Sequence, residues 1–138
     1  PERLKYYRRI AGAEKEEQLR EIQRELLDRF GMLPPPVLAL FDATRIRETA
    51  RRIGVERVVL KDNILRLYFI SDPQSTFFQT SVFGKVIEYV QHYPVKVKMK
   101  ETPKYLSIVF PGTENIKEVL DHVRDVHDFV TREPKVEA

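Results

Sequence analysis

The chain has 138 residues, 42% of them hydrophobic and 33% charged, which is the balance of one globular domain with a charged exterior. Its net charge of +3 is too small to indicate a nucleic-acid partner unless the positive side chains gather on one face. The sequence contains no cysteine, which excludes disulfides, thiolate nucleophiles and cysteine metal sites. Because it has neither a long apolar run nor a signal-peptide core, we expect a cytoplasmic protein.

The first predicted element is a short lead-in helix over residues 2–11, which ends at Gly12. Its apolar residues at helical spacing are Leu4, Tyr7 and Ala11. A second helix is predicted over residues 13–30 and stops at Gly31. Steps of three and four residues place one buried stripe along it, formed by Leu19, Ile22, Leu26 and Phe30.

Three consecutive prolines, residues 34–36, predict a stiff bend after the second helix. A third helix is predicted to begin at about Val37 and to end before Gly54. The residues expected on its buried side are Ala43, Ile46, Ala50 and Ile53.

The hydrophobic period changes at Val55. Residues 55–60 and 64–70 are rich in branched and aromatic side chains and flank Asp62-Asn63, which predicts a tight β-hairpin. A helix is expected over residues 75–92. In residues 95–100, apolar side chains alternate with lysines, which predicts a strand whose partner is residues 106–110.

A last helix is predicted over residues 114–131, followed by a charged tail, 132–138, that we expect to be flexible. Its expected inward residues are Ile116, Val119, Leu120, Val123 and Val130. The order predicts an α+β fold, in which N-terminal helices precede two β-hairpins, each followed by a helix, with the antiparallel sheet packed against helices. We expect residues 1–12 to be a linker helix and residues 13–131 to form a single α+β domain.

No constellation in the sequence indicates catalysis, a cofactor or a metal. His122 and His127 are five residues apart on a predicted helix, so their side chains diverge. His122 and Asp125 are expected to be an exposed helix pair without a nearby nucleophile. Gly84-Lys85 lacks the preceding strand and glycine of a phosphate loop. We therefore predict that this domain is not an enzyme.

A row of lysines on the predicted strand is the first candidate site. Lys96, Lys98 and Lys100 project from one face, with Lys104 near the following turn and Tyr105 beside it. Such a face is suited to nucleic-acid phosphates. The alternative, which we favour from sequence, is an exposed edge where lysines discourage pairing with another strand.

A row of carboxylates on the second helix is the second candidate site. Glu17, Glu21, Glu25 and Asp28 fall within about 80° of one face, opposite the apolar stripe. Such a row serves either solubility or docking to a basic partner, and Arg20, Arg24 and Arg29 flank it.

The segment around this row resembles a known family. Residues 25–31, Leu33-Pro34 and the helix up to Gly54 are similar to a motif of the C-terminal domain of bacterial transcription-repair coupling factors, the Mfd family. Residues 4–11 are similar to the stretch that leads into that domain from the motor. The resemblance covers roughly residues 1–70, and Pro35-Pro36 departs from the family's commoner pattern of a single later proline.

The resemblance implies a non-catalytic regulatory domain of an ATP-driven DNA translocase. In that family the domain docks on the N-terminal UvrB-like module of the same protein and hides its UvrA-binding surface until RNA polymerase and DNA loosen it. Glu25 and Asp28 match the acidic positions that face the module, and the same motif implies that Leu26 and Phe30 point inward while Leu33-Pro34 shapes the bend. A nucleic-acid-binding module and a structural or dimerisation cap remain the alternatives.

Overall fold

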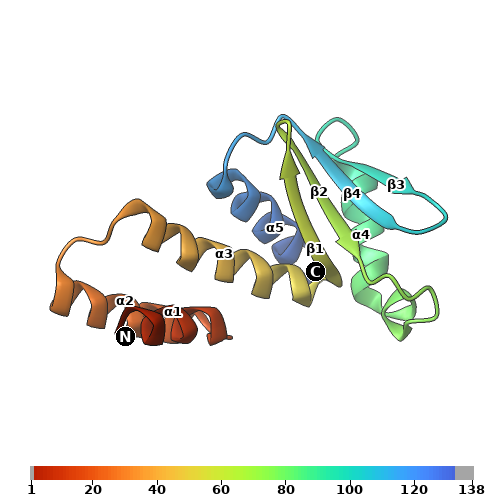
Figure 1. Ribbon diagram of the computed structural model, residues 1–138. Coiled ribbons are helices and arrows are strands. Elements are labelled where there is room, and N and C mark those ends of the chain that lie inside the picture. Colours follow the sequence, from red (N-terminus) through yellow and green to blue (C-terminus); the bar gives the residue numbers. More distant parts are fainter. Residues whose placement is uncertain (1, 133–138) are drawn as a thin grey trace, which may run out of the picture. The chain divides into compact units, whose positions relative to one another are not determined.

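The computed structural model describes residues 2–132, which divide into two compact units between Glu48 and Thr49 (Figure 1). The first unit is helical and contains α1 (Glu2–Gly12), α2 (Glu16–Phe30) and most of α3 (Pro35–Arg52). The second contains the sheet, and its elements are β1 (Val55–Lys61), β2 (Ile64–Phe69), a 3-10 turn (Thr76–Gln79), α4 (Ser81–His92), β3 (Lys98–Glu101), β4 (Leu106–Pro111) and α5 (Ile116–Thr131).

The helical unit is built around one apolar cluster, formed by Tyr6, Ile10, Ala13, Leu19, Ile22, Leu26, Leu33 and Phe41. Three residues of the predicted α2 stripe are therefore buried, but the prediction for Phe30 is wrong. Its side chain is 52% exposed, because Phe30 is the last residue of α2 and the chain turns away at Gly31 with a φ of 76°. Its ring packs edge to face with Tyr6, at 6.1 Å between centroids, and the Arg29 guanidinium lies 5.8 Å from its centroid.

The buried faces of α1 and α3 also differ from expectation. α1 carries two apolar stripes, and the one that packs is Tyr6 and Ile10 rather than Leu4, Tyr7 and Ala11. α3 begins at Pro35, because a proline in the first helical turn needs no hydrogen-bond acceptor for its nitrogen. Within α3, Ala43 is exposed while Phe41 and Thr44 are buried.

The second unit contains a four-stranded antiparallel sheet in the order β1-β2-β4-β3, which confirms the predicted fold class. Asp62 and Asn63 both have positive φ, 54° and 60°, as the predicted two-residue hairpin turn requires. α4 and α5 cover the same side of the sheet (Figure 1), since Phe110 of β4 contacts both Tyr89 of α4 and His122 of α5. The side chains buried on this side are Leu65, Leu67, Phe69, Ile108 and Phe110.

Two predicted elements are corrected in this unit. The helix expected over residues 75–92 is interrupted at Thr80, whose hydroxyl caps α4 by accepting a hydrogen bond from the Phe83 amide. The strand expected from residue 95 begins only at Lys98, because the Tyr93 carbonyl accepts hydrogen bonds from the amides of residues 96 and 97 in a turn. Val95 is 93% exposed in that turn.

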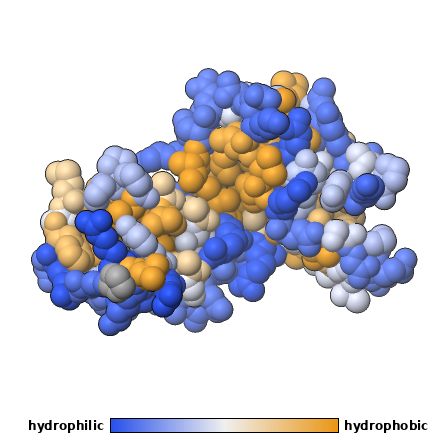
Figure 2. Space-filling model, viewed as in Figure 1, coloured by the Kyte–Doolittle hydropathy of each residue, from blue (hydrophilic) through white to orange (hydrophobic). Residues whose placement is uncertain are grey.

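α5 begins after the cap residue Asn115. Its first residue, Ile116, is 36% exposed rather than buried as predicted. The expectation for the tail falls mostly on residues 133–138, which lie outside the described residues. Much of the viewed surface is hydrophilic, as the composition predicts (Figure 2). None of the helices within residues 2–132 is long and apolar enough to cross a membrane.

Candidate functional site

The acidic row on α2 is only partly a free face. Glu17, Glu21 and Asp28 are exposed, whereas Glu25 is half-buried. The helical period explains the difference, because those three residues lie within about 40° of one another and opposite the buried stripe. Glu25 lies on the flank, about 90° from the centre of that stripe, where it meets α1.

Glu25 is held by Arg9 of α1. Two guanidinium nitrogens donate to its carboxylate, one of them at 3.1 Å between Nη2 and Oε1. The hydrogen bond from Arg9 is the main cause that lowers the pKa of Glu25, and the same contact raises the pKa of Arg9. In the helical unit, Glu25 therefore acts as a tie between α1 and α2.

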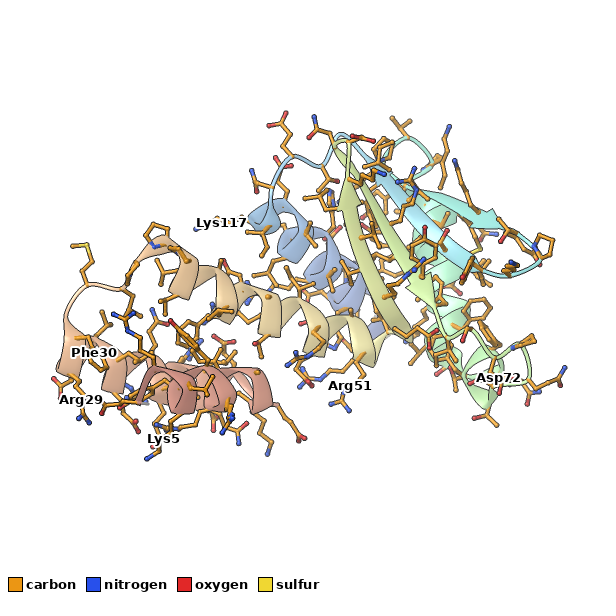
Figure 3. All side chains as sticks on the ribbon, viewed as in Figure 1. Lys5, Arg29, Phe30, Arg51, Asp72 and Lys117 are labelled. Atoms are coloured by element: carbon orange, nitrogen blue, oxygen red, sulfur yellow. The ribbon has the colours of Figure 1, made fainter. Side chains whose placement is uncertain are left out.

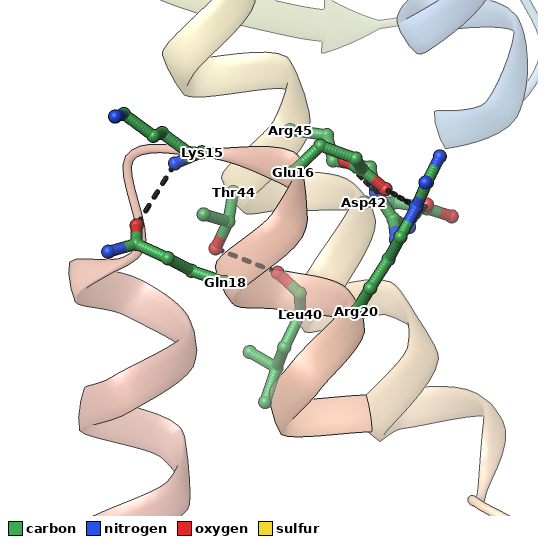
Figure 4. Close-up of polar contacts among 8 residues, drawn as sticks. All are labelled: Lys15, Glu16, Gln18, Arg20, Leu40, Asp42, Thr44 and Arg45. Atoms are coloured by element: carbon green, nitrogen blue, oxygen red, sulfur yellow. Dashed lines mark hydrogen bonds and ion pairs between the residues drawn. The ribbon is translucent and has the colours of Figure 1, made fainter. Parts of the chain in front are cut away.

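The opposite flank of α2 is tied to α3 (Figure 4). Nε of Arg45 donates to both oxygens of Glu16, at 3.0 and 3.2 Å, and Nη1 donates to Asp42 at 3.1 Å. Burial opposes the charge on Arg45, but hydrogen bonds and charges from Glu16 and Asp42 raise its pKa above the ordinary value. The start of α2 is closed by the Gln18 side chain, which accepts a hydrogen bond from the Lys15 amide.

Between these two flanks the outer face of α2 keeps its carboxylates unengaged. Among residues 2–132, the side chains of Glu17 and Asp28 make no ion pair or hydrogen bond. Glu21 contributes only an electrostatic interaction with Arg9. Rigid ties on both sides and free charges on the outside are the features expected of a docking helix.

An apolar groove of about 480 Å³ lies at the C-terminal end of α2. Its lining includes Tyr7, Phe30, Met32 and Leu33, and Met32 is 93% exposed. Figure 3 shows Phe30 and Arg29 at this end of the helix. The groove could not be predicted while Phe30 was expected in the core, although the position of Phe30 at the helix end indicated that its ring would be uncovered.

The four lysines of the other candidate site are not brought together. Lys98 and Lys100 lie on the edge strand β3, but Lys96 precedes the strand and Lys104 follows it. Lys96 forms an ion pair with Asp125 at 2.8 Å. The register instead places Lys98 and Lys100 on the same face of the sheet as Arg66 and Tyr68 of β2, with β4 between the two strands. The alternation of Arg66 and Tyr68 with buried residues was the signal for this face.

The expected exposed pair of His122 and Asp125 is only half correct, because Asp125 is exposed while His122 is partly buried. The His122 ring stacks on Phe110 at 4.4 Å, and burial is the main cause that lowers its pKa. Asp125 accepts hydrogen bonds from the Tyr89 hydroxyl at 2.6 Å and from Lys96 at 2.8 Å. These contacts join α4, α5 and the turn before β3. Within the described part of the chain, no group of three or more His, Asp or Glu side chains is placed to hold a metal.

Comparison with known structures defines the class of this fold. The crystal structure of the C-terminal domain of a transcription-repair coupling factor matches with a TM-score of 0.69, over 92% of this chain and 77% of that one, at 22% identity. The architecture is therefore that of an α+β domain of this type.

The sequence matches the TRCF domain model over residues 1–80, and the chain belongs to this family. The transcription-repair-coupling factor of Escherichia coli K12 is 46% identical over 56 residues, which is 41% of this chain. That of Staphylococcus epidermidis RP62A is 29% identical over 113 residues, which is 75% of this chain. These matches span only 5% and 10% of the two relatives. The family resemblance expected from the α2 motif is confirmed.

Proposed function

We propose that the chain is a non-catalytic, autoinhibitory domain of a transcription-repair coupling DNA translocase, working in the cytoplasm. In this proposal it docks on the N-terminal UvrB-like module of the same protein and masks the UvrA-binding surface of that module. RNA polymerase and DNA act on it indirectly, through the full-length protein. The observation that carries the proposal is the unengaged acidic face of α2, inside the segment that matches the family.

The physical argument rests on rigidity and tethering. Glu16 and Glu25 fix the two flanks of α2, so Glu17, Glu21 and Asp28 are presented at constant spacing. Carboxylates in such an arrangement contribute orientation and specificity to docking on a basic surface more than affinity. Because the two modules belong to one polypeptide, a high effective concentration compensates for weak contacts between them. An interface of weak contacts can also dissociate without unfolding either module.

In this proposal the acidic residues have different roles. Glu25 positions α1 against α2, and Glu17, Glu21 and Asp28 contact the partner. The groove beside Phe30 and Met32 receives an apolar side chain of the module, since an exposed apolar recess is what a buried anchor residue fills.

A calorimetric titration of the chain against the UvrB-like module tests the proposal. The double variant Glu17→Lys/Asp28→Lys reverses charge on the outer face of α2 without removing an ion pair or side-chain hydrogen bond among residues 2–132. We expect it to weaken docking by at least about tenfold, equivalent to 1.4 kcal/mol. The matched control is Glu88→Lys/Asp121→Lys, which makes the same charge change at exposed positions of α4 and α5. Equal affinities for the double variant and the unmodified chain would refute the role of α2.

A further inference from the structure

The side of the sheet away from α4 and α5 is an open, basic face. Strand register places opposite residues on the same side, so β1, β2, β3 and β4 contribute alternate residues to it. Its cations are Arg57, Lys61, Arg66, Lys98 and Lys100. No Asp or Glu occupies an alternate position on this face within the paired strands.

These cations have no counter-ions within residues 2–132, since none of the five forms an ion pair there. The carboxylates of the same unit gather elsewhere, and α5 alone carries Glu118, Asp121, Asp125 and Asp128. The sheet face is thus uniformly positive, whereas α5 carries both signs, with Lys117 and Arg124 beside its four carboxylates. Like charges held together on a small face repel one another, and an anionic partner would relieve that repulsion.

Aromatic rings lie among these cations. Tyr68 and Tyr105 meet edge to face at 5.5 Å, and the Arg57 guanidinium lies 4.2 Å from the centroid of Tyr68 and 5.4 Å from that of Tyr105. Tyr105 is 42% exposed. The partly exposed Val59 and Ile64 add apolar surface to the same face of the sheet.

We propose that this face binds single-stranded nucleic acid, independently of the docking function of α2. Phosphates contact Lys98, Lys100 and Arg66. Bases stack on Tyr68 and Tyr105 and contact the apolar side chains of Val59 and Ile64. A four-stranded sheet with aromatic rings on the side away from its helices suits unstacked bases. It cannot enter a duplex groove as a helix or a two-stranded ribbon does, which favours a single strand over a duplex.

The test is fluorescence anisotropy of a labelled oligothymidylate of about 12 nucleotides, titrated with the 138-residue chain at roughly 50 mM salt. We expect a Kd on the order of 10 µM that weakens steeply with salt. Lys98→Gln/Lys100→Gln should weaken binding about tenfold and reduce the salt slope by about 1.4, because each phosphate contact on a single strand contributes about 0.7. Tyr105→Ala should weaken binding about tenfold with an unchanged salt slope, because it removes stacking and not charge.

The matched control is Lys117→Gln/Arg124→Gln, which removes the same charge from exposed positions of α5 (Figure 3 shows Lys117). It should bind like the unmodified chain. Equal losses in both double variants would show attraction by net charge alone and overturn the proposal. Competition by polyglutamate as strong as that by unlabelled oligothymidylate, with Tyr105→Ala unaffected, would assign the face to an acidic protein instead. Absence of binding at about 100 µM protein would also overturn it.

Discussion

Arg9 and Glu25 join α1 to α2 through two hydrogen bonds between the guanidinium and the carboxylate. Glu25 lies within residues 1–80, which match the family, yet its carboxylate points to a helix of its own chain. α2 thus combines a structural acid at position 25 with a free acid at position 28. We therefore expect a charge reversal at Glu25 to affect the proposed docking through the position of α1, and one at Asp28 to affect it directly.

The first prediction concerns this tie. Glu25→Lys places two cations together, so the amides of α1 should exchange with deuterium faster than in the unmodified chain. Adding Arg9→Glu restores opposite charges and should restore protection. Glu17→Lys, which removes no ion pair or side-chain hydrogen bond among residues 2–132, serves as the control. Unchanged exchange in Glu25→Lys would show that the remaining contacts of α1, which include the Arg29–Glu2 ion pair and the burial of Tyr6 and Ile10, hold it without this tie.

The second prediction separates the two large apolar residues at the end of α2. Leu26 is 5% exposed, so Leu26→Ala should cost about 2–5 kcal/mol of unfolding free energy. Phe30 is 52% exposed, so Phe30→Ala should cost about 1 kcal/mol or less while weakening docking through the groove. Urea denaturation measures both costs. A larger loss for Phe30 than for Leu26 would show that Phe30 is covered in solution.

The third prediction uses two glycines as a matched pair. Gly54 has a φ of 79°, and a Cβ there would collide with the Phe77 ring, so Gly54→Ala should destabilise the chain by about 1–3 kcal/mol. Gly84 lies inside α4 with open space around it, so Gly84→Ala should stabilise by about 0.5–1 kcal/mol. Thermal melting compares the two, and melting-temperature shifts of the same sign would contradict the assigned environments.

The fourth prediction concerns acid. Burial acts to raise the pKa of Asp125, but hydrogen bonds from Lys96 and Tyr89 outweigh it, so the folded pKa lies below the ordinary value of 3.8. The stability from this carboxylate is therefore complete above 3.8 and is lost as pH falls through the lowered folded pKa. Asp125→Asn should lower stability at neutral pH and flatten the acid limb of the stability curve. Asp121→Asn should leave that limb steep. Identical acid limbs in Asp125→Asn and the unmodified chain would show that the hydrogen bonds from Tyr89 and Lys96 to Asp125 do not contribute to stability in acid.

The spacing of apolar residues predicted most of the helices and strands, because the buried face of each one can be identified from its own segment of sequence. The stripe of Leu19, Ile22 and Leu26 and the turn at Asp62-Asn63 needed no knowledge of the tertiary structure. Errors arose where two patterns competed. In α1 either apolar stripe was possible, and contact with α2 selected Tyr6 and Ile10.

The candidate sites were harder to predict because they depend on contacts between distant residues. The alternation of residues 95–100 indicated one long strand, but hydrogen bonds to the Tyr93 carbonyl turn its first half and leave Lys96 paired with Asp125. Arg57, Arg66 and Lys98 lie far apart in sequence, and only strand pairing brings them onto one face. Likewise the spacing of Glu25 placed it in the acidic row, and only the position of α1 revealed its partner.

The most direct test of the autoinhibitory role uses the full-length protein and measures UvrA binding without RNA polymerase, by biolayer interferometry. Glu17→Lys/Asp28→Lys in this domain should increase UvrA binding. In the proposed mechanism the domain and UvrA compete for the same surface of the UvrB-like module, so the free energy that docking loses is gained by UvrA binding. Lys98→Gln/Lys100→Gln should leave UvrA binding unchanged. Normal exclusion of UvrA by the Glu17→Lys/Asp28→Lys protein, with its fold verified by circular dichroism, would contradict the account.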